Sequence, residues 1–410
     1  MTRKFRSTSW LASRHRATEF VIGGLLVAYV FYVLMLSKFF SPSVEQSWFR
    51  DLGILWMLSD YVFEHHRYPP HGYFFPPPNA VIVHAFGLID RELAFRLYLM
   101  IQIFCGALLL WMWSRCLGLT KRPDRLLIVL VAILASLRYV HIELAMHNVN
   151  LLTLALVSGA VLFHRNRPAG FFYALSLAIK PYSSVLVLPW MVWRGYFSWA
   201  THAVLWLLVF FLALPVLCFG LSDTGVLYRD WIEALTVATI DHTTGLSVRA
   251  GLATLFNLPV TDPLVAQANT IATGLWIAVI LLFFAPTLFR RSPGSSSTIA
   301  TELAAILLTA LPVGALQQPA RGVAILIAML VIAATAFADG TSRRSRIALL
   351  AVLAFVGISS QMVPMGPLFA LLTLPICLAA VAGLAIVRYE SSRRRRPSLS
   401  EQATSSAICP

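Results

Sequence analysis

The chain has 410 residues and a formal net charge of +14; 58% of its residues are hydrophobic and 12% are charged. A soluble domain of this length needs a charged exterior, and so few charged residues exclude one. The apolar runs are continuous rather than alternating, which excludes a transmembrane β-barrel. Many runs are long enough to cross a bilayer. The sequence therefore predicts an all-α, polytopic membrane protein.

The positive charge is concentrated in short segments between apolar runs, which is typical of cytoplasmic loops. The arginine run 393–396 predicts contact with anionic membrane lipid. No aromatic or Gly-rich recognition pattern accompanies this run, so we expect no nucleic-acid partner. The five cysteines form no CxxC pair, and we interpret them as packing residues without a disulfide framework or a metal site.

The apolar runs predict a single transmembrane domain over residues 20–388, with about 12 membrane segments and both termini in the cytoplasm. Basic tails are expected at 1–19 and 389–410. The run 20–40 is too long for the apolar part of a signal peptide, so we expect an uncleaved first helix. The other expected segments are 93–114, 126–140, 150–164, two short helices within 169–193, 199–219, 267–288, 299–316, 322–338, 347–360 and 367–387.

This topology predicts two loops on the outer side, a first outer loop at 41–78 and a long outer loop at 220–265. The apolar stretch 79–90 is too brief to span, and we expect it at the interface. Basic residues then lie mainly inside, while the outer segments are relatively rich in acids. A shift of one helix would invert this bias. We therefore expect a multi-pass protein of a bacterial inner membrane whose polar clusters face the periplasm.

The first polar candidate is Asp51, just after the first apolar run. A carboxylate there can act as a general base toward an acceptor hydroxyl. The alternative is a solvated loop acid that is neutralised by Arg50.

Two further candidates are an aromatic segment and a polar turn. Tyr68 opens the aromatic, Pro-rich segment, whose rings can stack on sugar or isoprenoid or can form an ordinary aromatic belt. His147, Asn148 and Asn150 stand at the start of the expected segment 150–164. Their imidazole and amides can hydrogen-bond sugar hydroxyls, and Asn148 can equally cap the helix.

Cationic side chains form the next group of candidates. Lys180 lies deep in an apolar stretch, and Pro181 breaks the helix there. A point cation at a broken helix suits a phosphate, and the alternative is a lysine that snorkels to the surface. Arg249 and Arg321 can hold a leaving phosphate in their planar fork, or can pair with local acids. Their polar clusters also contain the candidate sugar or acceptor ligands Asp241, Gln317 and Gln318.

Four stretches carry a resemblance to a known family: Asp51 with Tyr68 and Phe74-Phe75-Pro76-Pro77, His147-Asn148-Val149-Asn150-Leu151-Leu152, Ala169-Gly170 through Lys180-Pro181, and Asp241-His242-Thr243-Thr244-Gly245. In order and spacing they resemble glycosyltransferase family 87, of the GT-C fold. The family's corresponding stretches are an Asp followed by a Tyr and a Tyr-Pro-Pro-like turn, Gly-Gln-Val-Asn-Leu-Leu, an Ala-Gly…Lys-Pro hairpin, and Asn-Gln-Ser-x-x-Gly. The resemblance runs from the first helix to about residue 335.

Members of this family include polyprenyl-phosphate-mannose-dependent mannosyltransferases and decaprenyl-phosphate-arabinose-dependent arabinofuranosyltransferases. The resemblance implies that a sugar, mannose first, moves from a polyprenyl-phosphate donor to a glycolipid or polysaccharide acceptor. It implies a single inverting displacement with Asp51 as the base, and with Lys180, Arg321 and Arg249 stabilising the leaving phosphate. It implies no metal and no cofactor besides the lipid-linked donor.

The chain departs from the family pattern at two places. Residues 317–321 read Gln-Gln-Pro-Ala-Arg where many members carry a Ser-x-x-x-His-His-like sequence, and His147 stands where glycine is usual. Two alternatives to the enzyme stay open, and the second rests on these departures. A transporter or flippase would carry two related halves with matching broken helices. An inactive relative would serve as a scaffold subunit.

Overall fold

The computed structural model describes residues 21, 24, 28, 32, 51–69, 75–145, 147–165, 168–181, 184–241, 248–288, 296–309, 322–362 and 367–394. Every element within these residues is helical, as expected. The elements are α3 (Asp51–His65), α4 (Pro77–Phe86), α5 (Arg91–Cys116), η1 (Leu119–Lys121), α6 (Arg125–Ala135), α7 (Leu137–Ala145), α8 (Asn150–Leu162), α9 (Ala169–Ile179), α10 (Val187–Trp193), α11 (Phe197–Leu208), η2 (Val209–Ala213), α12 (Leu214–Asp241), α13 (Val248–Phe256), α14 (Pro263–Leu288), α15 (Ser296–Thr309), α16 (Ala324–Ala336), α17 (Arg343–Met362) and α18 (Pro367–Arg394).

Four helical stretches of the described residues are long and apolar enough to cross a membrane: Glu92–Cys116, Phe197–Leu235, Pro263–Pro286 and Leu371–Arg393. A fifth is possible if the bent pair α6 and α7 forms one span. Four further apolar helices have 10–17 residues: α8, α9, most of α15, and α16. The expected count of about 12 segments is therefore not confirmed. The expected tail 1–19 lies outside the described residues, and α18 continues past residue 388 to Arg394.

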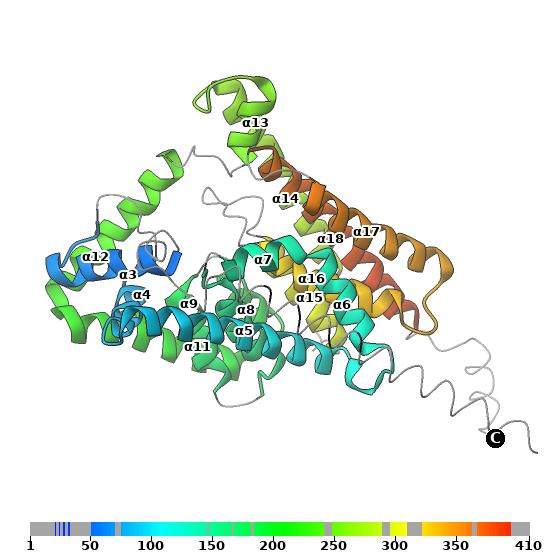
Figure 1. Cartoon of the computed structure of the whole chain (residues 1–410), viewed down its shortest axis with the longest axis horizontal. Helices are drawn as coiled ribbons and strands as arrows, with labels where there is room; N and C mark the ends of the chain where they lie inside the picture. Colours follow the sequence, from blue (N-terminus) through cyan, green and yellow to red (C-terminus); the bar gives the residue numbers. More distant parts are fainter. Residues whose placement is uncertain are drawn as a thin grey trace, which may run out of the picture.

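The centre of the larger apolar core is α16, which is apolar on all sides and almost entirely buried. A helix without a polar face is stable only where neighbours cover its whole circumference. Helices α6, α15, α17 and α18 pack around it. Figure 1 shows this group on the right, α3, α4 and α12 on the left, and α13 at the top. A smaller core joins α3 and α4 to the starts of α5 and α8 and to the end of α9.

The expected segment 126–140 is not one straight helix, because α6 and α7 meet at an angle of 74°. The break is at Ser136, whose hydroxyl donates to the Ala132 carbonyl at 2.8 Å. A serine that bonds back to the preceding turn competes with the main-chain ladder and bends helices. The bend directs α7 toward the polar turn at 147–150.

The segment 169–193 forms two short helices, α9 and α10, as expected. The first ends at Lys180, whose backbone is extended (φ −158°, ψ 104°). Pro181 follows, and a proline disfavours helical backbone at the residue before it.

The expected long loops contain helices. The segment 41–78 holds α3, and 220–265 holds most of α12 and all of α13. Gly220 has φ 80° and ψ 166°, a conformation open to glycine, and it breaks α12 into two parts. The far part is tied to the residues after α3 by the pairs His66–Asp223 at 2.6 Å and Arg67–Asp230 at 2.7 Å. These two pairs hold the second part of α12 against the segment that follows α3.

Helices α5 and α8 lie side by side and run in the same direction. Gln102 of α5 donates to the Asn148 carbonyl just before α8, and three turns later Trp113 Nε1 donates to Ser158 Oγ at 3.0 Å. Since α9 ends at Lys180 near Asn148, these helices define two ends of the bundle. We call the end with Asn148 and Lys180 the Lys180 end, and the opposite one the Arg194 end.

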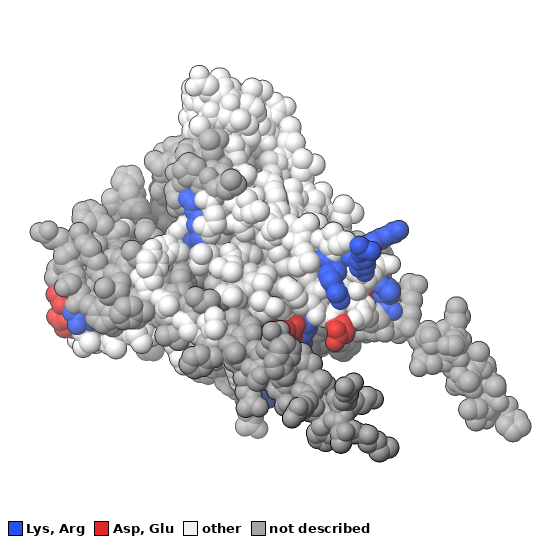
Figure 2. Space-filling view, turned by 45° about the vertical axis from the view of Figure 1, so that its right-hand side comes forward, with Lys and Arg blue, Asp and Glu red and all other residues white. Residues whose placement is uncertain are grey.

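The Arg194 end carries much of the positive charge. Arg122, which follows α5, donates to the carbonyls of Ala334 and Phe337 where α16 ends, and this places the turn between α16 and α17 at this end. The first turn of α17, which follows, carries the exposed arginines Arg343, Arg344 and Arg346. Figure 2 shows one group of Lys and Arg side chains at the right of this face, and separate basic side chains at its upper left and left edge.

Candidate functional site

The centre of the candidate site is the buried ammonium group of Lys180. The residue is 5% exposed, and its Nζ donates to Asn148 Oδ1 at 3.1 Å. The Nζ also lies 5.6 Å from the centre of the Phe75 ring, within the range of a cation–π contact. The side chain therefore points into the protein instead of snorkelling to the surface. An inward-facing cation beside an amide and an aromatic ring is suited to bind an anionic oxygen.

The turn between α7 and α8 supplies the amide. His147 has φ 52°, in the left-handed region where glycine is favoured, and this accounts for a glycine at the same place in the resembled pattern. Its buried ring meets the Phe95 ring edge-on, with centroids 5.9 Å apart. The Asn148 main chain is held on both sides, since its N–H donates to the Glu143 carbonyl at 3.2 Å and its own carbonyl accepts from Tyr98 Oη at 3.0 Å.

Asn150 does not point at Lys180. Its Nδ2 donates to Glu143 Oε2 at 2.9 Å, and the main-chain N–H of Leu151 donates to Glu143 Oε1 at 2.9 Å. The side chain of Glu143, at 0% exposure, therefore caps α8 from outside the helix. Asn148 Oδ1 accepts from the adjacent Val149 N–H at 2.8 Å and from Lys180 Nζ at 3.1 Å.

The sequence reasoning missed several buried polar groups of this site. The predicted site residues do not include Glu143 of α7, Tyr98 and Gln102 of α5, or Asn79 of α4. A signal was present for two of them: Glu143 follows the apolar run 126–140, and Gln102 interrupts the apolar stretch of α5. Polar groups in such stretches are expensive and mark functional sites.

Tyr68 and Asn79 tie the segment before and within α4 to the break in the hairpin. Tyr68 Oη donates to the Phe75 carbonyl at 2.6 Å, and Asn79 Nδ2 donates to the Ile179 carbonyl at 2.9 Å. These bonds hold the Phe75 ring over Lys180. Tyr68 is thereby placed at the site, with its hydroxyl turned to the backbone.

Asp51 begins α3, and its side chain lies outside the described part of the structure. The next residue, Leu52, is buried in the same apolar cluster as Val149 and Ile179, the neighbours of Asn148 and Lys180. Helix α3 therefore shares an apolar core with the residues next to Asn148 and Lys180.

The remaining predicted residues are not brought to Lys180 by the described structure. Arg249 donates from Nε to the Val260 carbonyl at 3.0 Å, and its helix α13 packs on α14 and α18. Figure 1 shows α13 standing away from α8 and α9. Asp241 ends α12, and its side chain is not described. Gln317, Gln318 and Arg321 lie outside the described residues, which resume at Gly322. There the chain is so close to the ring of Tyr139 in α7 that it leaves no room for a side chain.

The described residues contain no group of three or more His, Cys, Asp and Glu side chains placed to hold a metal ion. The Lys180 site offers a different set of groups, namely an ammonium, amides, an imidazole and aromatic rings. These groups suit an anionic, hydroxyl-rich ligand.

The fold and the site define a helical membrane protein with a buried polar site at one end of its bundle. The model of glycosyltransferase family 87 matches residues 73–313, more than half of the chain, and the chain belongs to this family. The resemblance seen in the sequence is thereby confirmed, and the protein is a membrane glycosyltransferase. A search of curated proteins and a search of solved structures each gave no match.

The matched range includes the hairpin with Lys180 and the turn from His147 to Asn150. It begins after Asp51 and Tyr68, and it ends before the stretch 317–321. Family membership therefore covers the buried cation and its amide partner, while the role of Asp51 has to be argued separately.

Proposed function

We propose that this glycosyltransferase takes its sugar from a polyprenyl-phosphate donor, with mannose as the first candidate sugar. The observation that carries the proposal is the buried Lys180 ammonium, held 3.1 Å from Asn148 Oδ1 at the break between two short helices. A donor that is both lipid-linked and anionic needs a cation below the protein surface and close to the membrane.

The chemistry proposed for Lys180 is charge stabilisation. A phosphodiester donor carries one negative charge, whereas the departing polyprenyl phosphate carries about −1.5 to −2 at neutral pH. A fixed cation therefore binds the leaving group more strongly than the donor and lowers the barrier to its departure. Lys180 supplies this charge without a metal ion, and no cofactor besides the lipid-linked donor is required.

Asp51 is the proposed base. Its carboxylate takes the proton of an acceptor hydroxyl, the hydroxyl oxygen bonds to the anomeric carbon, and the bond from that carbon to the phosphate oxygen breaks. This single displacement inverts the anomeric centre. The assignment is supported by the apolar cluster that Leu52 shares with Val149 and Ile179, since this cluster connects α3 with the residues next to Asn148 and Lys180.

The proposed orientation follows from the two ends of the bundle. Arg122, Arg343 and Arg344 mark the Arg194 end, and loops rich in Lys and Arg favour the cytoplasmic side. The Lys180 end then faces the outside of a bacterial inner membrane. A glycolipid or a polysaccharide is the proposed acceptor on that side.

The experiment compares membranes that contain equal amounts of wild type, Asp51→Asn, Lys180→Met and Asp124→Asn. Each receives radiolabelled polyprenyl-phosphate mannose or, separately, the arabinose donor, with a native lipid extract as acceptor. Asp124 pairs with Arg122 at the Arg194 end and is the matched control for removal of a carboxylate.

We expect label transfer by wild type and Asp124→Asn. We expect a loss of about 100-fold or more in Lys180→Met and Asp51→Asn, because each removes a group that acts on the transition state. Equal transfer by Asp51→Asn would remove Asp51 as the base. Failure of wild type with both donors would favour the transporter or the inactive scaffold.

A further inference from the structure

Glu143 is placed to control the geometry of the Lys180 site without touching the ligand. Its carboxylate is fully buried, and both oxygens accept hydrogen bonds at 2.9 Å, one from Asn150 Nδ2 and one from the Leu151 N–H. Leu151 is the second residue of α8, and the N-cap residue Val149 makes no cap of its own. Glu143 therefore fixes the first turn of α8 and neutralises its positive end.

The same residue also holds Asn148 through its backbone. The Glu143 carbonyl accepts from the Asn148 N–H at 3.2 Å and from Gln102 Nε2 at 3.4 Å. The position of Asn148 is thus set by Glu143 before it and by the first turn of α8 after it. Its Oδ1 accepts at once from the Val149 N–H and from Lys180, so little freedom is left to the amide.

We propose that Glu143 is a positioning residue of the transferase, which acts through Asn148 to hold the Lys180 ammonium where the leaving phosphate forms. This inference rests on the proposed function. The Glu143 carboxylate already occupies the N-terminus of α8. The donor phosphate therefore binds Lys180 and not this helix end.

The first test is Glu143→Gln, which keeps the shape of the side chain but places an amide NH₂ against one of two N–H donors. The turn must shift to relieve this contact, and a misplacement of about 1 Å at a catalytic group costs about 100-fold in rate. We expect kcat to fall by about 10- to 100-fold. The donor KM should change less than about threefold, because Lys180 acts mainly on the leaving phosphate.

The second test is rescue by exchange of the two groups. In the double variant E143Q/N150D the carboxylate stands at position 150 and the amide at position 143. The amide NH₂ at 143 then donates to the carboxylate at 150. The amide oxygen at 143 still accepts from the Leu151 N–H. We expect the double variant to recover at least about tenfold of the lost kcat. Asn150→Asp alone brings two carboxylates together and should lose activity.

The third test asks whether Glu143 acts through Lys180. In a Lys180→Met background, Glu143→Gln should cause no further fall in kcat, because the group that it positions is gone. Independent losses that multiply in the double variant would overturn the positioning role and leave Glu143 as a structural residue.

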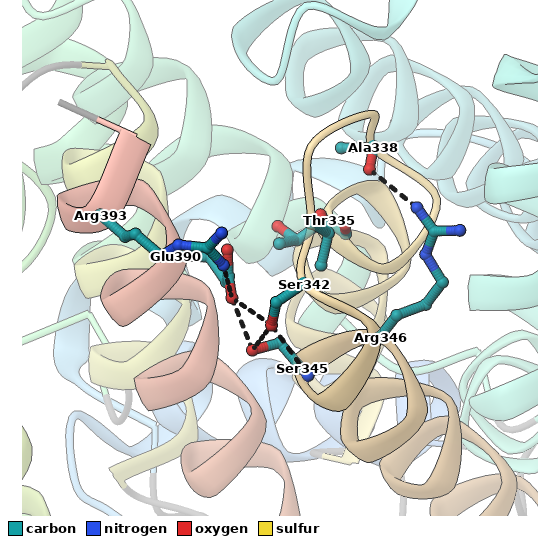
Figure 3. Close-up of polar contacts among 8 residues, drawn as sticks. Thr335, Ala338, Ser342, Ser345, Arg346, Glu390 and Arg393 are labelled. Carbon is teal, nitrogen blue, oxygen red and sulfur yellow. Dashed lines mark hydrogen bonds and ion pairs between the residues drawn. The ribbon is translucent and has the colours of Figure 1, made fainter. Parts of the chain in front are cut away.

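The matched control is Glu390→Gln at the Arg194 end. Glu390 is 1% exposed, and its Oε1 accepts from Ser342 Oγ at 2.8 Å and from Ser345 Oγ at 2.6 Å, beside the first turn of α17 (Figure 3). Like Glu143, it is a buried carboxylate that accepts hydrogen bonds at the start of another helix. We expect Glu390→Gln to lower the unfolding temperature while kcat per folded molecule stays unchanged.

Binding of polyprenyl phosphate separates this inference from the proposed function, because it needs no acceptor. The rise in Tm of the purified chain with polyprenyl phosphate should be present in wild type and Glu390→Gln, and smaller in Glu143→Gln and Lys180→Met. One outcome overturns the role of Glu143 alone. In it, wild type transfers sugar, and Glu143→Gln keeps both the full kcat and the full rise in Tm. A wild type that neither transfers sugar nor gains Tm overturns both proposals.

Discussion

Arg194 and Glu302 form a buried ion pair that joins the end of α10 to α15, at the opposite end of the bundle from Lys180. Glu302 is fully buried and also accepts from Trp190 Nε1 at 3.0 Å, while an Arg388 nitrogen of α18 lies 3.9 Å from its second oxygen. Three helices that are far apart in sequence therefore meet at one carboxylate. A buried ion pair of this kind is destabilising to break from one side, because the remaining charge loses its partner.

Removal of the Glu302 carboxylate should therefore destabilise the fold without altering the chemistry. We expect Glu302→Ala to lower the free energy of unfolding by about 3–5 kcal/mol. Thermal unfolding in detergent micelles measures the effect, and kcat per folded molecule should match wild type. The double variant R194M/E302L should lose less stability than Glu302→Ala, because it leaves fewer buried charges without partners. A larger loss in the double variant would contradict this explanation.

The crossing of α9 and α11 depends on Gly170. A Cβ at this position would stand 2.7 Å from the Ala203 nitrogen and 2.8 Å from the His202 carbonyl carbon, which are main-chain atoms that cannot rotate away. We expect Gly170→Ala to destabilise the fold by about 1–3 kcal/mol. The control is Gly159→Ala in α8, where the nearest atom is Met112 Sδ at an ordinary 3.5 Å. That change should be neutral or stabilising by up to about 1 kcal/mol.

Because the His147 backbone is left-handed, substitutions by glycine and by alanine can distinguish its structural role from its proposed contact with the sugar. His147→Gly and His147→Ala both remove the imidazole, but only glycine adopts φ 52° without strain. We expect the glycine variant to be more stable than the alanine variant by about 1 kcal/mol. If the imidazole binds the sugar, both variants should raise the KM for donor or acceptor equally. A full-activity glycine variant would remove His147 from the proposed sugar-binding residues.

Local patterns were sufficient to predict the helical class, the family, the hairpin at Lys180-Pro181 and the polar turn at His147. Each of these depends on residues that are adjacent in sequence: long apolar runs, a lysine before a proline, a group of amides at a helix start. The segments 41–78 and 220–265 contain polar and proline residues, which predict loops and do not indicate the helices that form there. Their stability comes from distant partners, such as Asp223 with His66, which no local pattern reveals.

The candidate site shows the same limit. Lys180 was found because its own position is unusual, whereas Glu143 and Gln102 become meaningful only when three helices converge on Asn148. The bend at Ser136 was missed for a related reason, since a serine within an apolar run is compatible with a straight helix until its hydroxyl bonds to the preceding turn.

The two contacts between α5 and α8 fix the sliding register of these helices. Gln102 holds the chain just before α8, and Trp113, three turns further on, holds Ser158 at 3.0 Å within it. Because the helices are parallel, a shift of one residue, about 1.5 Å along the axis, would break both contacts at once. The two contacts therefore fix how far along the α5 axis the Asn148 turn lies from the end of the bundle that contains Trp113 and Ser158.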